Sequence, residues 1–87
     1  MTPVRIYTTR WCGYCVRAKT LLESRGVPYE EVGLDDDPAF RQTLHELTGG
    51  WTVPQIIVGG RSIGGYTELW RLDREGRLDD LLAAAAA

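Results

Sequence analysis

The sequence predicts one α/β domain with a mixed four-stranded sheet and helices on both faces, in the order β-α-β-α-β-β-α, followed by a short last helix. Three observations carry this prediction. The apolar spacing changes from two residues to three or four at the cysteine pair, as it does where a strand leads into a helix. A further strand after that helix completes a right-handed parallel unit. Later, a Gly-Gly pair joins two short strands as an antiparallel hairpin.

The first strand and helix meet at the two cysteines. Residues 3–9, "PVRIYTT", alternate apolar and polar positions and are rich in β-branched and aromatic types, which predicts a strand. The apolar positions that follow have the spacing of one helix face: Cys15, Ala18, Leu21 and Leu22. Gly26 suits a left-handed helix end, and Pro28 cannot continue the helix. We therefore expect a helix that begins at the cysteines and stops before Gly26.

The next segment predicts a strand and a second helix. Residues 28–34 read as a strand in which Tyr29 and Val32 are the packing residues. Asp37 is expected to cap a helix that begins at Pro38, because proline lacks the N–H group that would be unpaired there. This helix should end at Gly49-Gly50. Its expected apolar face consists of Phe40, Leu44 and Leu47.

The remaining elements include the centre of the sheet. Residues 54–58, "PQIIV", form a short continuous apolar run, as expected of a buried central strand. Gly59-Gly60 allows a tight turn into an edge strand over residues 61–63. A third helix is expected from Tyr66 to Gly76, with its inward residues at Leu69 and Leu72. A short helix through Leu78, Leu81 and Leu82 should follow.

Length and composition limit the class of protein. The chain has 87 residues, of which 44% are hydrophobic, so it can bury one core but not two. We expect a domain over residues 1–83 and a low-complexity alanine tail over 84–87, where fraying is expected. The net charge of -2, without a basic stripe, argues against nucleic acid as a partner. No apolar run approaches the roughly 18 residues of a membrane span, and no secretion signal is seen.

The two cysteines, Cys12 and Cys15, allow three interpretations: a metal clip, a structural staple or a redox pair. A zinc site needs about four ligands, and the sequence adds only His45, interpreted as an exposed or satisfied helical residue. A disulfide across so short a loop would constrain little chain entropy. A secreted chain of this size would carry several disulfides, so the close pair indicates a reducing compartment, and we expect a cytoplasmic protein.

The redox interpretation has a positive physical basis. Cys12 falls at the first turn of the helix, where the N–H groups of Tyr14 and Cys15 can point at its sulfur and stabilise a thiolate. An ordinary cysteine is only about 3% ionised at pH 7, whereas the pKa of about 3.5 to 7.5 found at such positions ionises half or more. Cys15 begins the apolar stripe and should be buried. We therefore expect Cys12 to attack a disulfide and Cys15 to resolve the mixed disulfide that forms.

At this point the chain resembles the glutaredoxins, small members of the thioredoxin-fold superfamily. The resemblance rests on three motifs in order, which cover nearly the whole length: "IYTTRWCGYC", "GGWTVPQI" and "IGGYTEL". It implies a thioredoxin-like fold and glutathione-dependent reduction of protein disulfides and of glutathione mixed disulfides. It also implies that Pro54 is cis and that its loop faces Cys12.

The resemblance further implies a site for glutathione. The backbone of the tripeptide would pair with Val53, and its γ-glutamyl end would meet the N-terminus of the third helix, where free N–H groups suit a carboxylate. The residues implied as glutathione ligands are Arg10, Tyr14, Thr52, Val53, Pro54, Gly65, Tyr66 and Thr67. Trp51 and Trp70 could line this groove, although such aromatics are more often core or rim residues. The implied partners are glutathionylated or disulfide-containing proteins and a small thiol.

Some residues depart from the family pattern and leave alternatives open. Many glutaredoxins have lysine where Thr9 stands and aspartate where Thr67 stands, so mycothiol or bacillithiol compete with glutathione as the thiol. Gly13 is also found in glutaredoxins that bridge a [2Fe-2S] cluster through Cys12 of two chains, which is the alternative function. A thioredoxin is the third possibility, from "WCGYC". Without a cluster we expect a monomer with no metal.

Overall fold

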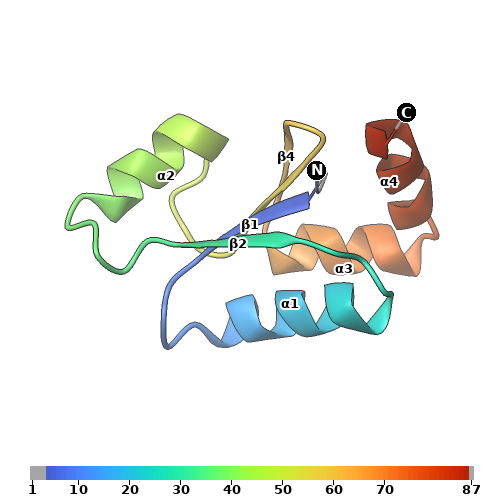
Figure 1. Cartoon of the computed structure of the whole chain (residues 1–87), viewed down its shortest axis with the longest axis horizontal. Helices are drawn as coiled ribbons and strands as arrows, with labels where there is room; N and C mark the ends of the chain where they lie inside the picture. The colour runs from blue at the N-terminus through green and yellow to red at the C-terminus, as the bar shows by residue number, and fades with distance from the viewer. Residues whose placement is uncertain (1–3, 87) are drawn as a thin grey trace.

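The computed structural model describes residues 4–86, and its element order is the expected one. The chain folds into a sheet with helices on both faces (Figure 1). The elements are β1 (Val4–Thr8), α1 (Gly13–Ser24), β2 (Glu30–Gly33), α2 (Phe40–Thr48), β3 (Gln55–Val58), β4 (Arg61–Gly64), α3 (Tyr66–Arg74) and α4 (Leu78–Ala86).

The four strands lie in the order β2-β1-β3-β4. β1 pairs with β2 in parallel and with β3 antiparallel, with Ile6 opposite Ile56 in the second pair. The predicted hairpin between β3 and β4 is confirmed, since both turn glycines have positive φ, 59° at Gly59 and 82° at Gly60, as a tight two-residue turn requires. β3 is therefore central and β4 is an edge strand. The predicted mixed sheet is confirmed.

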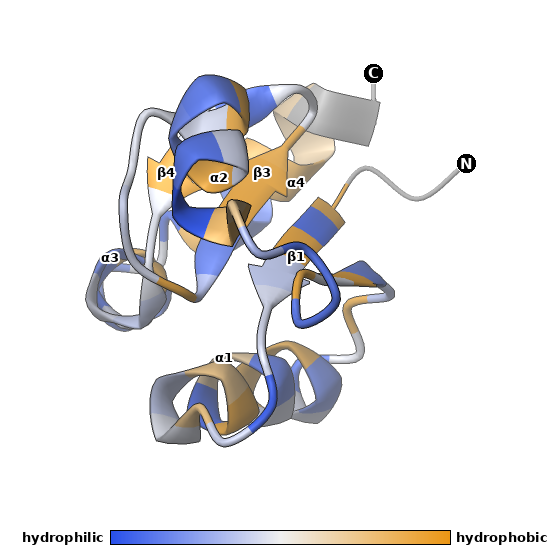
Figure 2. Ribbon diagram, turned by 90° about the vertical axis from the view of Figure 1, so that its left-hand side faces the viewer, coloured by the Kyte–Doolittle hydropathy of each residue, from blue (hydrophilic) through white to orange (hydrophobic). Residues whose placement is uncertain are grey.

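The larger core lies between the sheet and helices α1 and α3, which run along the same face (Figure 1). Leu22 of α1 and Leu69 of α3 pack there against the central strands. Figure 2 shows most of β3 in the hydrophobic colour, whereas α1 and α2 carry both colours, as elements that bury one side do. The buried members of this cluster are Val4, Ile6, Ala18, Leu22, Ile56, Val58, Leu69 and Leu78. These contacts fix the start of α1, and hence the cysteines, against the end of β1.

The opposite face is covered by α2, and here the predicted helix face is wrong in one position. Leu44 is fully buried against Tyr7 and Leu34, and Phe40 packs beside them. Leu47, however, has 54% of its surface exposed. Periodicity fixes the angle of a side chain around the helix, but it does not determine whether the sheet extends under each turn.

The ends of the first two helices test the predicted stop and start signals. Gly26 follows α1 with a φ of 67°, which confirms the left-handed residue expected there. The predicted start of α2 at Pro38 is wrong, because residues 38–39 form a turn and the helix begins at Phe40. Asp37 still accepts a hydrogen bond from the N–H of Ala39 at 2.8 Å. The aspartate thus caps the turn that leads into the helix.

The last helix, α4, is longer than its leucines require. Leu78 is buried against the larger core and Leu81 and Leu82 are partly buried, while the helical backbone continues through the alanines to Ala86. The boundary of a separate alanine tail at residue 84 stays a prediction. None of the helices in residues 4–86 has the length and hydropathy of a membrane span.

The two leucines of α2 give a matched test of this fold. Replacing Leu44 with alanine removes a fully buried side chain and should lower the free energy of unfolding by about 2–5 kcal/mol. Replacing the exposed Leu47 with alanine should change it by less than about 0.5 kcal/mol. Urea denaturation followed by circular dichroism measures both. Equal losses in the two variants would contradict the placement of α2.

Candidate functional site

The site is organised by the first turn of α1, where Cys12 is the N-cap residue. Its backbone is extended, and its sulfur accepts a hydrogen bond from the N–H of Cys15 at 3.1 Å. This is the bond that a serine or aspartate oxygen makes at a helix start, here made by sulfur. Of the two N–H groups expected at this sulfur, that of Cys15 is the donor in the described chain. Because no acidic residue stands in the first turn of α1, this helix end favours a thiolate.

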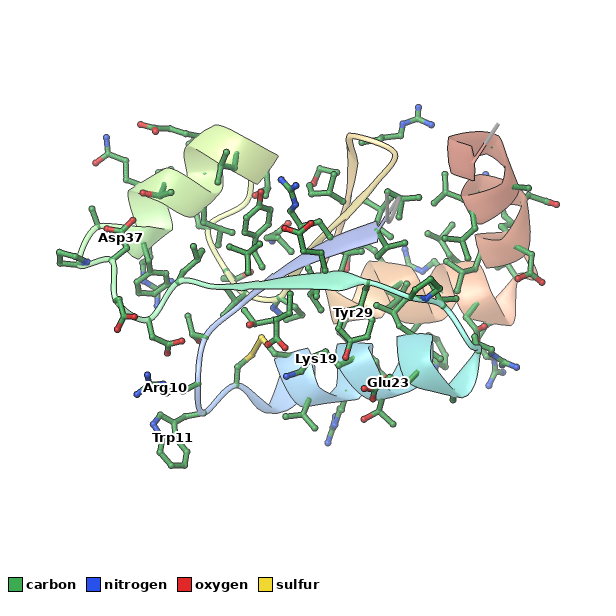
Figure 3. All side chains as sticks on the ribbon, viewed as in Figure 1. Arg10, Trp11, Lys19, Glu23, Tyr29 and Asp37 are labelled. Carbon is green, nitrogen blue, oxygen red and sulfur yellow. A yellow bond between two sulfur atoms is a disulfide. The ribbon has the colours of Figure 1, made fainter. Side chains whose placement is uncertain are left out.

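The two sulfurs are unequally exposed, as the apolar spacing predicts. Cys15 has only 1% of its surface exposed, whereas Cys12 is half-buried. The structure joins them in a disulfide, drawn as the yellow bond near the start of α1 in Figure 3. A partner can therefore reach the sulfur of Cys12, and Cys15 lies beneath it.

A loop with a cis peptide bond lies opposite the cysteines. The bond between Val53 and Pro54 is cis, which confirms the expectation from the family resemblance. The carbonyl oxygen of Val53 is 3.7 Å from the Cys12 sulfur. The side-chain amide of the buried Gln55 donates to the carbonyl oxygen of Thr52 at 2.8 Å and so holds the loop in this position. The loop and the half-buried sulfur border one another.

A groove of about 670 Å³ runs from this loop to the start of α3, and we call it the groove below. Seven of the eight residues expected to bind glutathione line it: Tyr14, Thr52, Val53, Pro54, Gly65, Tyr66 and Thr67. They come from three separate parts of the chain. Their role as ligands stays a prediction, but the structure brings them together beside Cys12.

The start of α3 is pressed against the cis-proline loop. A side-chain carbon added at Gly65 would lie 3.1 Å from the carbonyl oxygen of Pro54, closer than such contacts normally are. Gly65 has ordinary negative φ, so the requirement for glycine comes from space and not from backbone conformation. Glycine at this position therefore allows both walls of the groove to approach each other.

Glu68 also lines the groove, and the sequence reasoning missed it. It is the charged residue among the described lining residues, and it stands in the first turn of α3. A carboxylate bound there would have to rely on the N–H groups at the helix start, with Glu68 opposing it. Its position three residues after Gly65 in "GGYTEL" was the available signal.

Trp51 fixes the groove loop to α2. Its ring stacks on the imidazole of His45 with 3.9 Å between centroids, and its carbonyl oxygen accepts from Arg41 at 3.0 Å. Although His45 was expected to be exposed or satisfied, its Nδ1 is buried and finds no hydrogen-bond partner among residues 4–86, so that expectation is wrong. The stack with Trp51 occupies the ring face instead. Neither Trp51 nor Trp70 lines the groove.

Arg10 lies apart from the other seven expected ligands. It borders a second hollow of about 410 Å³, formed by the end of β1, the start of α1 and β2, which we call the second hollow. Its N–H donates to the Asp35 carboxylate at 2.7 Å. Its neighbour Trp11 has a φ of 57°, a left-handed conformation that costs a bulky residue about 1–3 kcal/mol. Figure 3 shows both side chains extending away from the ribbon before α1.

Glu31 is the partly buried acid of the second hollow. The hydroxyl of Thr8 donates to its Oε2 at 2.7 Å, and Lys19 Nζ lies 3.1 Å from the same oxygen. The Thr8 hydrogen bond, and then Lys19, hold the pKa of Glu31 below its ordinary value, although burial acts in the opposite direction. The carboxylate is therefore the form that this structure stabilises.

The geometry permits a particular kind of chemistry. A disulfide brought to Cys12 can be attacked from outside, and the buried Cys15 can then close on Cys12 and release the bound partner. No group of three or more potential metal-ligating residues occurs in the described part of the chain. A [2Fe-2S] cluster bridged between two chains stays a prediction. The fold and this pair together define a thiol-disulfide oxidoreductase of the thioredoxin-like class.

The chain belongs to the glutaredoxin family, whose model matches residues 4–63. It is 49% identical to a glutaredoxin of Pseudomonas aeruginosa over 97% of this chain and 100% of that one. Glutaredoxin 3 of Escherichia coli K12 is 45% identical over 94% of this chain and 99% of its own length. The buckwheat glutaredoxin-glutathione complex superposes with a TM-score of 0.86 at 33% identity, covering 98% of this chain and 80% of that one. The protein is thus a glutathione-dependent disulfide oxidoreductase.

The contact between Gly65 and Pro54 can be tested directly. Replacing Gly65 with alanine must move the start of α3 from the loop by a few tenths of an ångström. We expect KM for a glutathionylated peptide to rise about two- to tenfold, because binding groups on the two walls lose alignment. Gly33→Ala is the control, since its added carbon meets its nearest atom at 3.5 Å. An unchanged KM in Gly65→Ala would contradict a binding role for these walls.

The Glu31 contacts predict a dependence of stability on pH. Because the folded pKa of Glu31 is lowered, its contribution is present above the unfolded value of about 4.5 and is lost as pH falls through the folded pKa. Glu31→Gln and Thr8→Val should each flatten the decline of the free energy of unfolding below about pH 5. Urea denaturation across this range measures it. A decline as steep as in the parent protein would contradict the assignment.

Proposed function

We propose that Cys12 is the attacking thiol, that Cys15 is the resolving thiol, and that the groove holds glutathione. The observation that carries the proposal is the Cys12 sulfur at the helix start, half-exposed above a buried partner and next to the groove. The N–H of Cys15 can stabilise the thiolate form of Cys12, which is the nucleophilic form.

For a glutathione mixed disulfide, Cys12 alone is sufficient. Its thiolate attacks the glutathione sulfur, the protein sulfur leaves as a thiolate, and glutathione becomes joined to Cys12. A second glutathione thiolate then attacks the glutathione sulfur of this mixed disulfide. Oxidised glutathione leaves, and Cys12 is regenerated as a thiolate. In this route the groove would hold the glutathione that is bound to Cys12.

For a protein disulfide, both cysteines are needed. Cys12 joins one sulfur of the target while the other leaves as a thiolate. Cys15 then attacks the sulfur of Cys12, which releases the target as a dithiol and leaves the disulfide that the structure contains. Two molecules of glutathione subsequently reduce this disulfide and leave as oxidised glutathione.

Two features support glutathione as the small thiol. The groove combines extended backbone at Val53 with the start of α3, which suits a short peptide that carries a carboxylate. A related glutaredoxin, that of buckwheat, was crystallised in complex with glutathione. We propose glutathione over mycothiol and bacillithiol on these grounds.

We infer that the enzyme works as a monomer in the cytoplasm on disulfide-containing or glutathionylated proteins. Both cysteines and all the groove residues come from one chain, so the reaction needs no second copy. A reducing compartment is needed to return the short Cys12–Cys15 disulfide to the dithiol.

Two serine variants test the assigned roles. Cys12→Ser should abolish reduction of both a glutathionylated peptide and a protein disulfide, by at least about 100-fold, because a serine hydroxyl is not ionised near neutrality. Cys15→Ser should retain the first reaction and lose the second. The rates are measured with glutathione, mycothiol or bacillithiol as the sole reductant. Substantial turnover by Cys12→Ser would refute the mechanism, and a faster rate with another thiol would refute only the choice of glutathione.

A further inference from the structure

Two hollows border the cysteine pair, and the proposed function uses only the groove. The second hollow lies on the β1 and β2 side of Cys12, whereas the groove is formed by the loop before β3, by β4 and by the start of α3. Since the strand order is β2-β1-β3-β4, the two hollows lie on opposite sides of the cysteines. Both Cys12 and Cys15 line the second hollow. A substrate at Cys12 can therefore contact the protein on either side.

The second hollow is bordered by a large apolar side chain that the fold leaves unused. Trp11 is fully exposed, at 100% of its surface, although it immediately precedes the attacking cysteine. Figure 3 shows the indole extending outward from the loop. Val16, one helical turn after Cys12, is also more than half exposed and lines the same hollow. Water thus covers an apolar surface directly beside the reacting sulfur.

The loop that presents Trp11 is held in place. The backbone of Trp11 is left-handed, with a φ of 57°, and the N–H of the preceding Arg10 is bonded to Asp35 at 2.7 Å. Tyr14, the other exposed aromatic near Cys12, stacks instead with Tyr66 on the groove side, with 6.2 Å between ring centroids. The indole is therefore fixed on the second-hollow side and is not part of the groove.

We propose that Trp11 and the second hollow dock an apolar side chain of the polypeptide whose disulfide Cys12 attacks, next to the attacked cysteine. This inference rests on the proposed function. The surface is continuous with the sulfur that the target must reach. The charged pair in the hollow, Lys19 and Glu31, is mutually neutralised at 3.1 Å, which favours an uncharged occupant. Fully exposed tryptophans are unusual on a surface without a partner, and buried tryptophans dominate protein interfaces.

Glutathione does not fit this role. Apart from its cysteine, the tripeptide has a γ-glutamyl group and a glycine, neither of which offers an apolar side chain to an indole. A polypeptide supplies such side chains on both flanks of its cysteine. Trp11 therefore distinguishes protein disulfides from glutathione mixed disulfides, and it acts by binding the target while Cys12 exchanges with one of its sulfurs.

The test uses two synthetic peptides, each closed by one disulfide, with leucine or with serine before both cysteines. We expect kcat/KM of the parent protein to favour the leucine peptide by about tenfold, a typical effect of one apolar contact. Trp11→Ser should remove this preference through KM and leave the rate on a glutathionylated small thiol within about twofold. Trp70→Ser is the control, because Trp70 is partly exposed on α3 and lines neither hollow.

A spectroscopic variant reports the contact itself. The chain has three tryptophans, so Cys15→Ser combined with Trp51→Phe and Trp70→Phe leaves Trp11 as the only one. When the leucine peptide is trapped as a mixed disulfide on Cys12, the emission of Trp11 should shift to shorter wavelength as the indole leaves water. Trapped glutathione should leave the emission unchanged.

The outcomes separate this inference from the function on which it rests. A parent protein that reduces both peptides equally, or a Trp11→Ser variant that loses all reactions to the same degree, overturns the docking surface alone. The same emission shift with glutathione also overturns it. A parent protein that reduces neither peptide nor the glutathionylated thiol overturns the proposed function, and the docking surface with it.

Discussion

One hydrogen bond, from the N–H of Cys15 to the sulfur of Cys12, determines how this protein can react. It makes the sulfur the N-cap of α1, so that the unpaired N–H end of a helix faces the atom that must carry negative charge. The same first turn places Cys15 one layer deeper, against the core. A single local geometry thus produces both an attacking thiol and a protected resolving thiol.

The groove depends on contacts between parts of the chain that are distant in sequence. The loop before β3 is held by Gln55 from within and by the stack of Trp51 on His45 from α2. Its cis-proline carbonyl lies close to Gly65 at the start of α3. The parts that would hold the substrate are therefore anchored in both layers of helices. This explains why a small chain without a deep cavity can still present a defined surface next to Cys12.

The two sides of the cysteine pair have different characters. On the groove side, the small and polar residues around Thr67 leave backbone groups available to a short peptide. On the other side, Trp11 and Val16 leave apolar surface exposed. A reductase that accepts both a tripeptide and larger proteins needs these two kinds of surface at one sulfur. Their separation allows each to change without loss of the shared chemistry.

The sequence alone determined the order of elements, the cysteine roles and the family motifs, because periodicity, turn glycines and helix starts are local properties. It could not show that Leu47 is exposed, that His45 stacks on Trp51, or that Arg10 lies across the cysteines from the other expected ligands. Each of these depends on which segments meet in space. The tertiary structure decided them, since a side chain's environment is set by distant neighbours that no local spacing encodes.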